Sequence, residues 1–178
     1  MKKNKKRDYI KIGILGGTFD PPHKGHLYIS KIALKKLRLK KILWVITKKN
    51  PLKNKPYLKL KERMKLSKEI TRKNKKISIK YFDEKIRSTS TFNLLNYIKR
   101  KTKADLFFLM GADNLAKFHK WNNWKKIPKL AKIAIFPRQN YSIKSLNSIA
   151  SKELNKKDLI YMNSKKINIS SSLIRKFW

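Results

Sequence analysis

The sequence predicts an α/β protein, a single-domain, Rossmann-like, doubly wound parallel sheet of five to six strands. Apolar runs of strand length, rich in β-branched and aromatic residues, recur at 10–15, 41–47, 77–82, 104–110, 132–136 and 159–162. Such runs are typical of strands buried on both faces. Segments with the apolar spacing of helices separate most of them, which favours parallel pairing. Glycines follow the first and the fourth run, and an open sheet binds ligands at such carboxyl ends, where its strand order reverses.

The length and composition favour one domain. A chain of 178 residues with 40% apolar residues can bury one core, and we expect a basic tail at 1–8 and a single domain at 9–178. The basic start resembles the first part of a signal peptide, but the apolar segment behind it ends at Gly16 and Gly17. No apolar run approaches the ~18 residues of a membrane span. We therefore expect a cytoplasmic protein with no membrane partner, and the lack of cysteine excludes disulfides and cysteine nucleophiles.

The formal net charge of +38 raises the alternative of a basic nucleic-acid-binding module. However, 40 of the 48 basic residues are lysines, whereas specific recognition of bases and phosphates favours arginine. The lysines are also spread over nearly every predicted element. We interpret this as a general lysine bias and expect no specific nucleic-acid partner. Only ten carboxylates are present, too few to favour an acidic metal cluster, and we expect no metal ligands from the protein.

The stretch 16–26, Gly-Gly-Thr-Phe-Asp-Pro-Pro-His-Lys-Gly-His, is the strongest motif. It lies between the first predicted strand and a helix whose apolar positions run from Leu27 to Leu37. Glycines let backbone N–H groups close on an anion, and the helix directs its partial positive end there. His23 and His26 would add side-chain donors to the same anion. The pattern favours a phosphate site; the alternative is a tight turn in which the histidines cap or pack.

Later segments are less specific. A lysine-rich loop bracketed by prolines spans 48–57, and surface helices are expected at 58–72 and 143–154. The cluster Ser88–Asn93 is typical of a capped helix start. Asp113 could accept hydrogen bonds from ribose or cap a helix at 115–119, and His119 is expected to be exposed. Because the first and fourth strands both end in glycine loops, we expect them to be neighbours at a topological switch point.

The motif at 16–26 resembles the G-x-F-x-P-x-H-x-G-H signature of the nucleotidyltransferases related in fold to class I aminoacyl-tRNA synthetases. Within that superfamily the chain most resembles the nicotinate-nucleotide adenylyltransferases, from about Ile10 to Arg175. The resemblance implies catalytic roles for His23 and His26. It also implies ATP binding by the surrounding turn, at Gly16, Gly17, Thr18, Phe19 and Gly25.

Three later segments carry the resemblance further. Asn-Pro-Leu-Lys at 50–53 resembles the family segment whose lysine reaches the triphosphate, here Lys53. Ile-Ser-Ser-Ser-Leu-Ile-Arg at 169–175 resembles I-S-S-T-x-I-R, which implies a catalytic role for Arg175. Gly111 to Trp121 matches G-x-D-x-x-x-x-F-x-x-W. The resemblance adds to the ATP site the residues Gly111, Asp113, Ser170, Ser171 and Ser172.

The same resemblance implies a site for nicotinate mononucleotide. Trp121 would stack on the pyridine ring, and backbone groups near Thr91, Phe92 and Asn122 would hold the substrate. The chain departs from the family pattern S-Y-T-x-D-T-L here, because Ser90, Asn93 and Leu94 replace its tyrosine, aspartate and second threonine. Any role of this segment therefore rests on backbone groups near Thr91 and Phe92.

The implied reaction is transfer of the adenylyl group of ATP to nicotinate mononucleotide, giving deamido-NAD and diphosphate. Catalysis would be positioning and charge neutralisation, with Mg²⁺ carried by the substrate phosphates. ATP and nicotinate mononucleotide are the expected partners, and nicotinamide mononucleotide is a candidate second substrate. The main alternative enzyme is another adenylyl- or cytidylyltransferase of the superfamily, such as the pantetheine-phosphate or glycerol-phosphate type.

Overall fold

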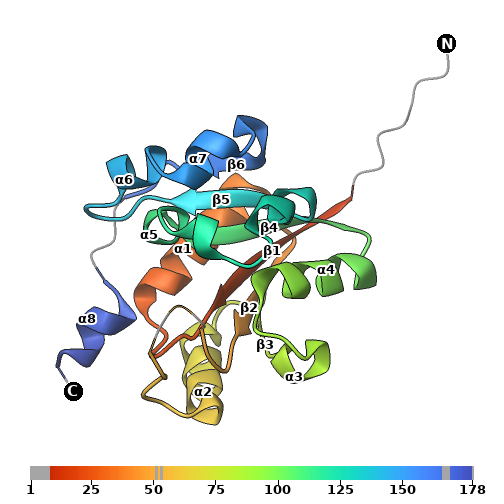
Figure 1. The fold of residues 1–178 in the computed structure, drawn as a ribbon. Helices are drawn as coiled ribbons and strands as arrows, with labels where there is room; N and C mark the ends of the chain where they lie inside the picture. The colour runs from red at the N-terminus through yellow and green to blue at the C-terminus, as the bar shows by residue number, and fades with distance from the viewer. Residues whose placement is uncertain (1–8, 51, 53, 166–168, 178) are drawn as a thin grey trace.

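The computed structural model describes residues 9–50, 52, 54–165 and 169–177, and its core is one six-stranded parallel sheet (Figure 1). The strand order is β3-β2-β1-β4-β5-β6. The strands are β1 (Ile10–Gly17), β2 (Lys41–Ile46), β3 (Ile77–Lys80), β4 (Ala104–Gly111), β5 (Lys132–Phe136) and β6 (Leu159–Tyr161). The predicted fold class is confirmed. The expected basic tail at 1–8 and Lys53 of the lysine-rich loop lie outside the described residues.

Helices cover both faces of the sheet (Figure 1). The longer ones are α1 (Lys24–Lys36), α2 (Leu60–Thr71) and α4 (Thr91–Lys101). Short α-helical turns are α3 (Asp83–Ile86), α5 (Ala112–Leu115), α6 (Ser142–Leu146), α7 (Ile149–Glu153) and α8 (Ser171–Arg175). The 3-10 turns are η1 (Phe118–Lys120), η2 (Trp124–Lys129) and η3 (Lys156–Asp158).

Side chains of the central strands alternate between two apolar layers. In β4, Leu106 and Phe108 join the layer that contains α4, whereas Phe107 and Leu109 join the layer that contains α1 and α2. All four are at most 7% exposed. Because both faces are covered, β2, β4 and β5 are apolar at nearly every position, which explains why they read as apolar runs in the sequence.

The predicted switch point lies between β1 and β4. β1 pairs with β2 on one side, with Gly17 opposite Ile46, and with β4 on the other, with Leu15 opposite Leu109. The chain runs outward from β1 to β2 and β3, then crosses back to β4 and continues outward in the other direction. The loops after β1 and β4 therefore diverge at the carboxyl edge of the sheet and leave room for a ligand.

Three sequence expectations are wrong in detail. The segment 143–154 forms two short helices, α6 and α7, because Ser148 begins the second by accepting a hydrogen bond from the N–H of Ser151 (3.2 Å). Asp113 does not cap a helix: α5 begins after Gly111, and Asp113 lies in its first turn. His119 is half-buried, and its Nδ1 has no hydrogen-bond partner among the described residues.

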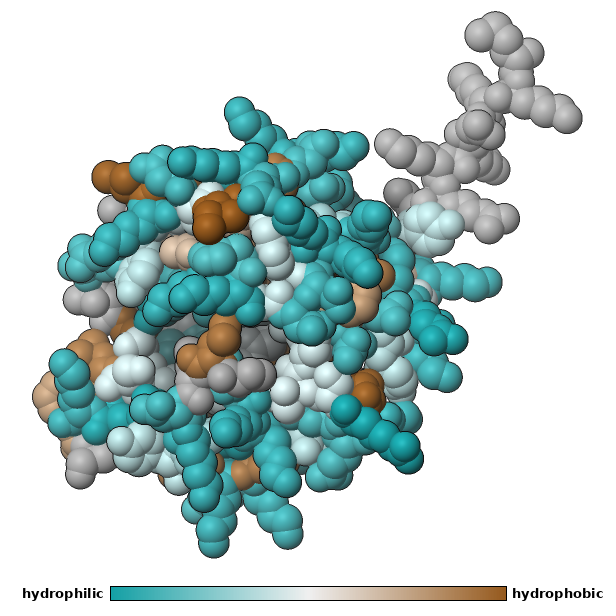
Figure 2. All heavy atoms as spheres, viewed as in Figure 1, coloured by the Kyte–Doolittle hydropathy of each residue, from teal (hydrophilic) through white to brown (hydrophobic). Residues whose placement is uncertain are grey.

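Hydrophilic side chains are spread over the whole visible surface, and hydrophobic ones appear singly among them (Figure 2). This distribution agrees with the interpretation that lysine is generally abundant and does not form one binding stripe. Within the described ranges, no helix is long and apolar enough to cross a membrane.

Candidate active site

A large cleft of about 730 Å³ opens at the carboxyl edge of the sheet, over the switch point. It brings together segments from both ends of the chain and from the loop after β4. Among the residues expected from the sequence, its walls contain Gly16, Gly17, Thr18, Phe19, His23, Gly25, His26, Gly111, Asp113, Ser170, Ser171, Ser172 and Arg175. The front turn and the last helix, which are about 150 residues apart, thus share one cavity.

His23 and His26 cap the first turn of α1 reciprocally. Nδ1 of His23 accepts a hydrogen bond from the N–H of Gly25, and Nδ1 of His26 accepts one from the N–H of His23, both at 3.2 Å. The two rings lie 3.8 Å apart between centroids. Because Nδ1 is the acceptor in each ring, the neutral form carries its proton on Nε2. The capping alternative for the histidines is therefore correct, and it also fixes which nitrogen can donate elsewhere.

His23 is neutral at physiological pH. Its side chain is 7% exposed, and burial, followed by the nearby positive charge of Arg138, lowers its pKa from 6.5 to about 4. A neutral imidazole still donates one hydrogen bond through Nε2 without the cost of burying a charge. The structure thus provides a donor at the cleft whose protonation does not change near pH 7.

The ring of Phe19 anchors the front turn to the sheet. Phe19 has a φ of 50°, which is uncommon for a residue other than glycine, and its ring is 2% exposed. The ring stacks on Trp44 of β2 at 5.0 Å and contacts His26 at 4.7 Å. Trp44 in turn donates from its indole N–H to Oγ of Ser30, which donates to the carbonyl of His26 (2.8 Å each). These contacts fix the turn and the start of α1 on the same strand.

Arg63 of α2 binds this turn through hydrogen bonds of its buried side chain. Its side chain is 1% exposed and donates four hydrogen bonds to the carbonyls of Thr18, Thr47, Lys48 and Leu58, at 2.6–3.2 Å. Burial lowers the pKa of the guanidinium, and the charges of Asp20 and Asp83 oppose this effect. Arg63 therefore ties together the chain segments after β1, after β2 and before α2.

The last helix docks onto the front turn. Oγ of Ser171 donates to the carbonyl of Pro21 (2.8 Å), and Nη1 of Arg175 donates to the carbonyl of Asp20. Ser170 accepts from the N–H of Leu173 (3.1 Å) and so caps α8. Ser170 therefore acts as the cap of this helix. Ser171 and Arg175, in contrast, connect this helix to the motif at 16–26.

Asp113 lies against Gly111 and Arg138. A Cβ on Gly111 would lie 2.3 Å from Oδ1 of Asp113, so glycine is needed for the carboxylate to take this place. Nε of Arg138 lies 3.8 Å from the same oxygen, which is an ion-pair distance but too long for a hydrogen bond. No described residue donates a hydrogen bond to this oxygen, although the atom is buried. The carboxylate therefore retains the capacity to accept hydrogen bonds in the cleft.

A second pocket of about 380 Å³ adjoins the cleft. Its walls include Thr91, Trp121 and Asn122, the residues for which the resemblance implies contact with the mononucleotide. The side chain of Phe92 instead packs against the core, and Phe92 is not part of the pocket wall. The indole of Trp121 is held edge-on by Phe108 and Phe118, at 6.0 and 5.2 Å between centroids. The two cavities share walls at Gly16, Gly17, Leu52, Phe108 and Trp121.

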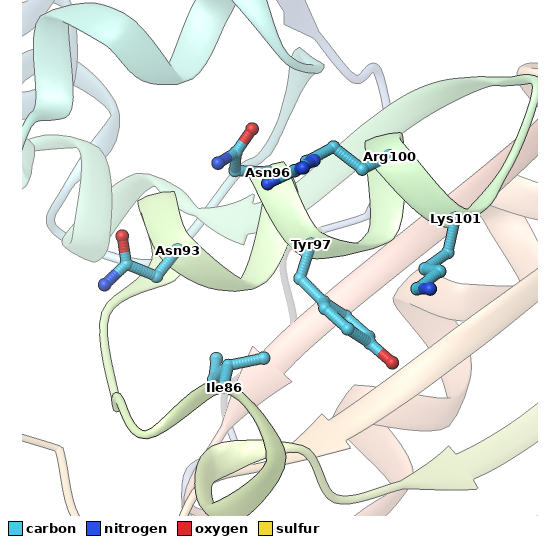
Figure 3. A pocket seen from close by; sticks show the side chains of 6 residues that line it. All are labelled: Ile86, Asn93, Asn96, Tyr97, Arg100 and Lys101. Carbon is cyan, nitrogen blue, oxygen red and sulfur yellow. The ribbon is translucent and has the colours of Figure 1, made fainter.

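A third, shallower hollow of about 520 Å³ lies between α3 and α4 (Figure 3). Its walls are Ile86, Asn93, Asn96, Tyr97, Arg100 and Lys101. It touches the second pocket through Ile86 and Asn93, and Asn93 is its one residue from the motifs of the sequence. In Figure 3, Tyr97 and Lys101 extend from α4 on the side of α3, whereas Asn96 and Arg100 project from another face of the helix.

Sequence reasoning missed six charged residues of the two cavities: Lys55 and Lys165 in the cleft, Asp83 in the second pocket, and three others. Asp20 and Arg138 line the cleft, and Lys120 lines the second pocket. Asp20 stands inside the motif and is one of only ten acids, and Arg138 is one of eight arginines and follows a predicted strand. Scarcity together with position could have identified both. No group of three or more histidine, cysteine or acidic side chains that could hold a metal occurs in the described parts of the chain.

Residues 14–177 match the family of cytidylyltransferase-like proteins. A protein of Pelagibacter ubique (strain HTCC1062) named probable nicotinate-nucleotide adenylyltransferase is 52% identical over 93% of this chain and 92% of its own length. A protein of the same name from Bradyrhizobium sp. (strain ORS 278) is 37% identical over 82% of this chain and 76% of its own.

The fold is also found in solved structures. The nicotinic acid mononucleotide adenylyltransferase of Plasmodium falciparum, complexed with NaAD, superposes with a TM-score of 0.72 at 22% identity. The superposition covers 95% of this chain and 84% of the other. The superposition shows the fold, and the matches of sequence show that the chain belongs to the cytidylyltransferase-like family and, within it, to the nicotinate-nucleotide adenylyltransferases.

Proposed function

We propose that this protein transfers the adenylyl group of ATP to nicotinate mononucleotide and forms deamido-NAD and diphosphate. The observation that carries the proposal is the pair of adjoining cavities that meet at Gly16, Gly17 and Trp121. A dinucleotide product requires two nucleotide sites joined at a phosphate-binding turn. Relatives that cover most of this chain have names for this activity, and the similar fold from Plasmodium falciparum holds NaAD.

In the proposed reaction, a phosphate oxygen of the mononucleotide attacks the α-phosphorus of ATP. A new phosphorus–oxygen bond forms as the bond to the bridging oxygen of diphosphate breaks, and the leaving group takes the electron pair. The attacking oxygen is already anionic, so the protein need not supply a nucleophile or a base. Its task is to bring two polyanions together and to stabilise the charge that shifts toward diphosphate.

The residues at the cleft suit this task. The Nε2 protons of His23 and His26 would contact the phosphates of ATP, together with Arg175 from α8. Gly16, Gly17 and Gly25 let the backbone approach. Lys53 keeps its proposed role at the triphosphate from the family resemblance alone. Asp113, with its unused acceptor capacity, would bind ribose hydroxyls near Gly111.

The second pocket would hold the mononucleotide. Trp121, fixed edge-on by two phenyl rings, presents a π face on which a cationic pyridine ring can stack. Backbone groups near Thr91, Phe92 and Asn122 would hold the carboxylate. Both acidic side chains of the described cleft lie next to arginines, which fits a Mg²⁺ ion carried by triphosphate oxygens and water. Such an ion would neutralise phosphate charge.

The direct test is to incubate the purified protein with ATP and nicotinate mononucleotide and to measure diphosphate and deamido-NAD together. We expect both in equal amounts. Parallel reactions contain 4′-phosphopantetheine or glycerol 3-phosphate in place of the mononucleotide, and these should give no diphosphate. Formation of diphosphate with either alternative acceptor, and none with the mononucleotide, would overturn the proposal in favour of another member of the superfamily.

A further inference from the structure

An acidic side chain in a cleft for triphosphate needs an explanation, because it repels the ligand. Asp20 is such a residue: it lines the cleft and is 4% exposed. Its two carboxylate oxygens accept hydrogen bonds from the N–H groups of Tyr57 and Leu58, each at 2.9 Å. The carboxylate is therefore fixed between the front turn and the chain that leads into α2.

The third partner of Asp20 is Arg175. Nη1 of Arg175 lies 3.5 Å from Oδ2 of Asp20 and also donates to the backbone carbonyl of the same residue. The guanidinium lies 5.0 Å from the centre of the Tyr57 ring, and Nη2 donates to Oγ of Ser172 at 3.3 Å. Asp20 thus contacts Arg175 with its side chain and its main chain, and its neighbour in space, Tyr57, contacts a face of the guanidinium.

These contacts leave part of the guanidinium available. An arginine carries five N–H donors, and the described contacts of Arg175 engage only its two terminal nitrogens. The side chain is 22% exposed at the cleft wall. A long arginine on the five-residue helix α8 would otherwise have to be ordered by the ligand, at a cost in conformational entropy.

We propose that Asp20 is a positioning residue that holds Arg175 in place for the phosphates of ATP. The inference rests on the function proposed above. The carboxylate does not touch the substrate in this proposal; it fixes the cation that does, while Tyr57 supports the guanidinium from one side. An acid at this point is tolerated in an anion site because its charge is already matched by arginine.

The experiment is a double-mutant cycle with Asp20→Asn and Arg175→Ala, read as kcat and as KM for ATP. Each single change is expected to lower kcat by about 100-fold, the size of effect of a small misplacement at a reacting centre. If Asp20 acts through Arg175, the double variant loses no more than Arg175→Ala alone. A double variant in which the two losses multiply would overturn the inference. The control is Asp105→Asn, which changes the charge equally at an exposed position at the start of β4.

Chemical rescue gives a readout that a purely structural role would not change. Free guanidinium ion should restore part of the activity of Arg175→Ala, because the carboxylate of Asp20 still provides a seat for it. The same ion should not restore the Asp20→Asn/Arg175→Ala variant. Equal rescue of both variants would overturn the inference.

A second variant covers the case in which Asp20→Asn does not fold. Tyr57 is 74% exposed, so Tyr57→Ala should leave the fold intact while removing the support under the guanidinium. We expect Tyr57→Ala to lower kcat severalfold when Arg175 is present and to have no effect in a protein that already carries Arg175→Ala. Equal losses in the two proteins would count against the proposal. A wild-type protein without adenylyl transfer would refute the proposed function, whereas an active wild type with a multiplicative cycle refutes only this inference.

Discussion

Gly25 and His23 lie so close that the imidazole occupies the place of a side chain on the glycine. A Cβ at Gly25 would lie 2.8 Å from Nδ1 of His23 and 2.9 Å from Cγ2 of Ile169. The N–H of Gly25 also donates to that same Nδ1. The glycine of the motif is therefore required for the orientation of a histidine that lines the cleft.

Replacement of Gly25 by alanine should displace His23 and lower kcat by about 10- to 100-fold. Alanine is the better helix former by up to ~1 kcal/mol, so the melting temperature should change little. Steady-state kinetics and thermal unfolding on the same sample test this combination. Lys31→Ala, at an exposed position of α1, controls for changes in the helix alone. Wild-type kcat in Gly25→Ala would show that the imidazole need not be where the structure places it.

The low pKa of His23 predicts a pH dependence of stability. In the folded protein this pKa is about 4, whereas in the unfolded chain it is ~6.5. Between these values the unfolded chain binds the proton and the folded protein does not, so stability falls as pH decreases from 6.5 to 4. The loss from this group should approach ~3 kcal/mol at the lower end. Above pH 6.5 the group should have no effect.

Urea unfolding of the wild type and of His23→Gln between pH 7.5 and 4 measures this effect. Because glutamine does not titrate, the free energy of unfolding of the variant should decrease less steeply below pH 6.5. Parallel curves for the two proteins would mean that His23 is not buried in its neutral form.

The hydrogen bonds of Arg63, which lies outside the cleft wall, predict that its replacement strongly destabilises the fold. Arg63→Met would leave four partly buried carbonyls without a donor, at a cost of ~3 kcal/mol. Arg63→Lys should lie between, since one ammonium cannot reach four carbonyls that lie in three segments. Chemical denaturation gives the values, and the matched control is Arg72→Lys at an exposed position just after α2. If Arg63→Lys were as stable as the wild type, the four hydrogen bonds would not be the reason for its burial.

The position of Lys120 in the proposed mononucleotide pocket predicts that the protein prefers nicotinate mononucleotide to nicotinamide mononucleotide. Among the described residues of the second pocket it is the single lysine or arginine, and it directly precedes Trp121. A carboxylate on the pyridine ring is attracted by it, and a neutral amide is not. Lys120→Gln should lower kcat/KM for nicotinate mononucleotide by about fivefold, as for an exposed charge pair, and leave the nicotinamide form unchanged.

The ratio of the two specificity constants is the measurement, because it cancels general losses of activity. Lys117→Gln, an exposed position three residues earlier, removes the same charge outside the pocket wall and should leave the ratio unchanged. If Lys117→Gln lowered the ratio as much as Lys120→Gln, the preference would follow the overall charge of the protein.

The strands and the adjacency of β1 and β4 could be predicted, because both follow from apolar runs and the glycines that end them. Apart from Lys11 and Asp105, β1 and β4 contain no polar side chain, since both faces are covered, and glycine marks the ends of both. The reciprocal capping by His23 and His26 is likewise a short-range feature. Arg63 could not be recognised as buried, because a basic residue in an amphipathic helix usually faces water. Only the fold brings it beneath three carbonyl-bearing segments.

The contact of Asp20 with Arg175 could not be read from the sequence for a different reason. The two residues are 155 positions apart, and either one alone is explained by solvation. The start of α5 shows the converse limit. Asp113 is of a residue type that often caps helices, but its carboxylate lies against Gly111. The helix begins one turn earlier than expected. Local preference does not decide such a boundary when a neighbouring glycine admits an alternative.

The carbonyl of Thr18, which accepts the shortest of the hydrogen bonds from Arg63, shares a peptide plane with the N–H of Phe19. In a trans peptide these two groups point in opposite directions. The guanidinium therefore aims that N–H away from itself, on a turn whose two residues both line the cleft. Arg63, which does not line the cleft, thus sets the direction of a backbone N–H in the cleft wall.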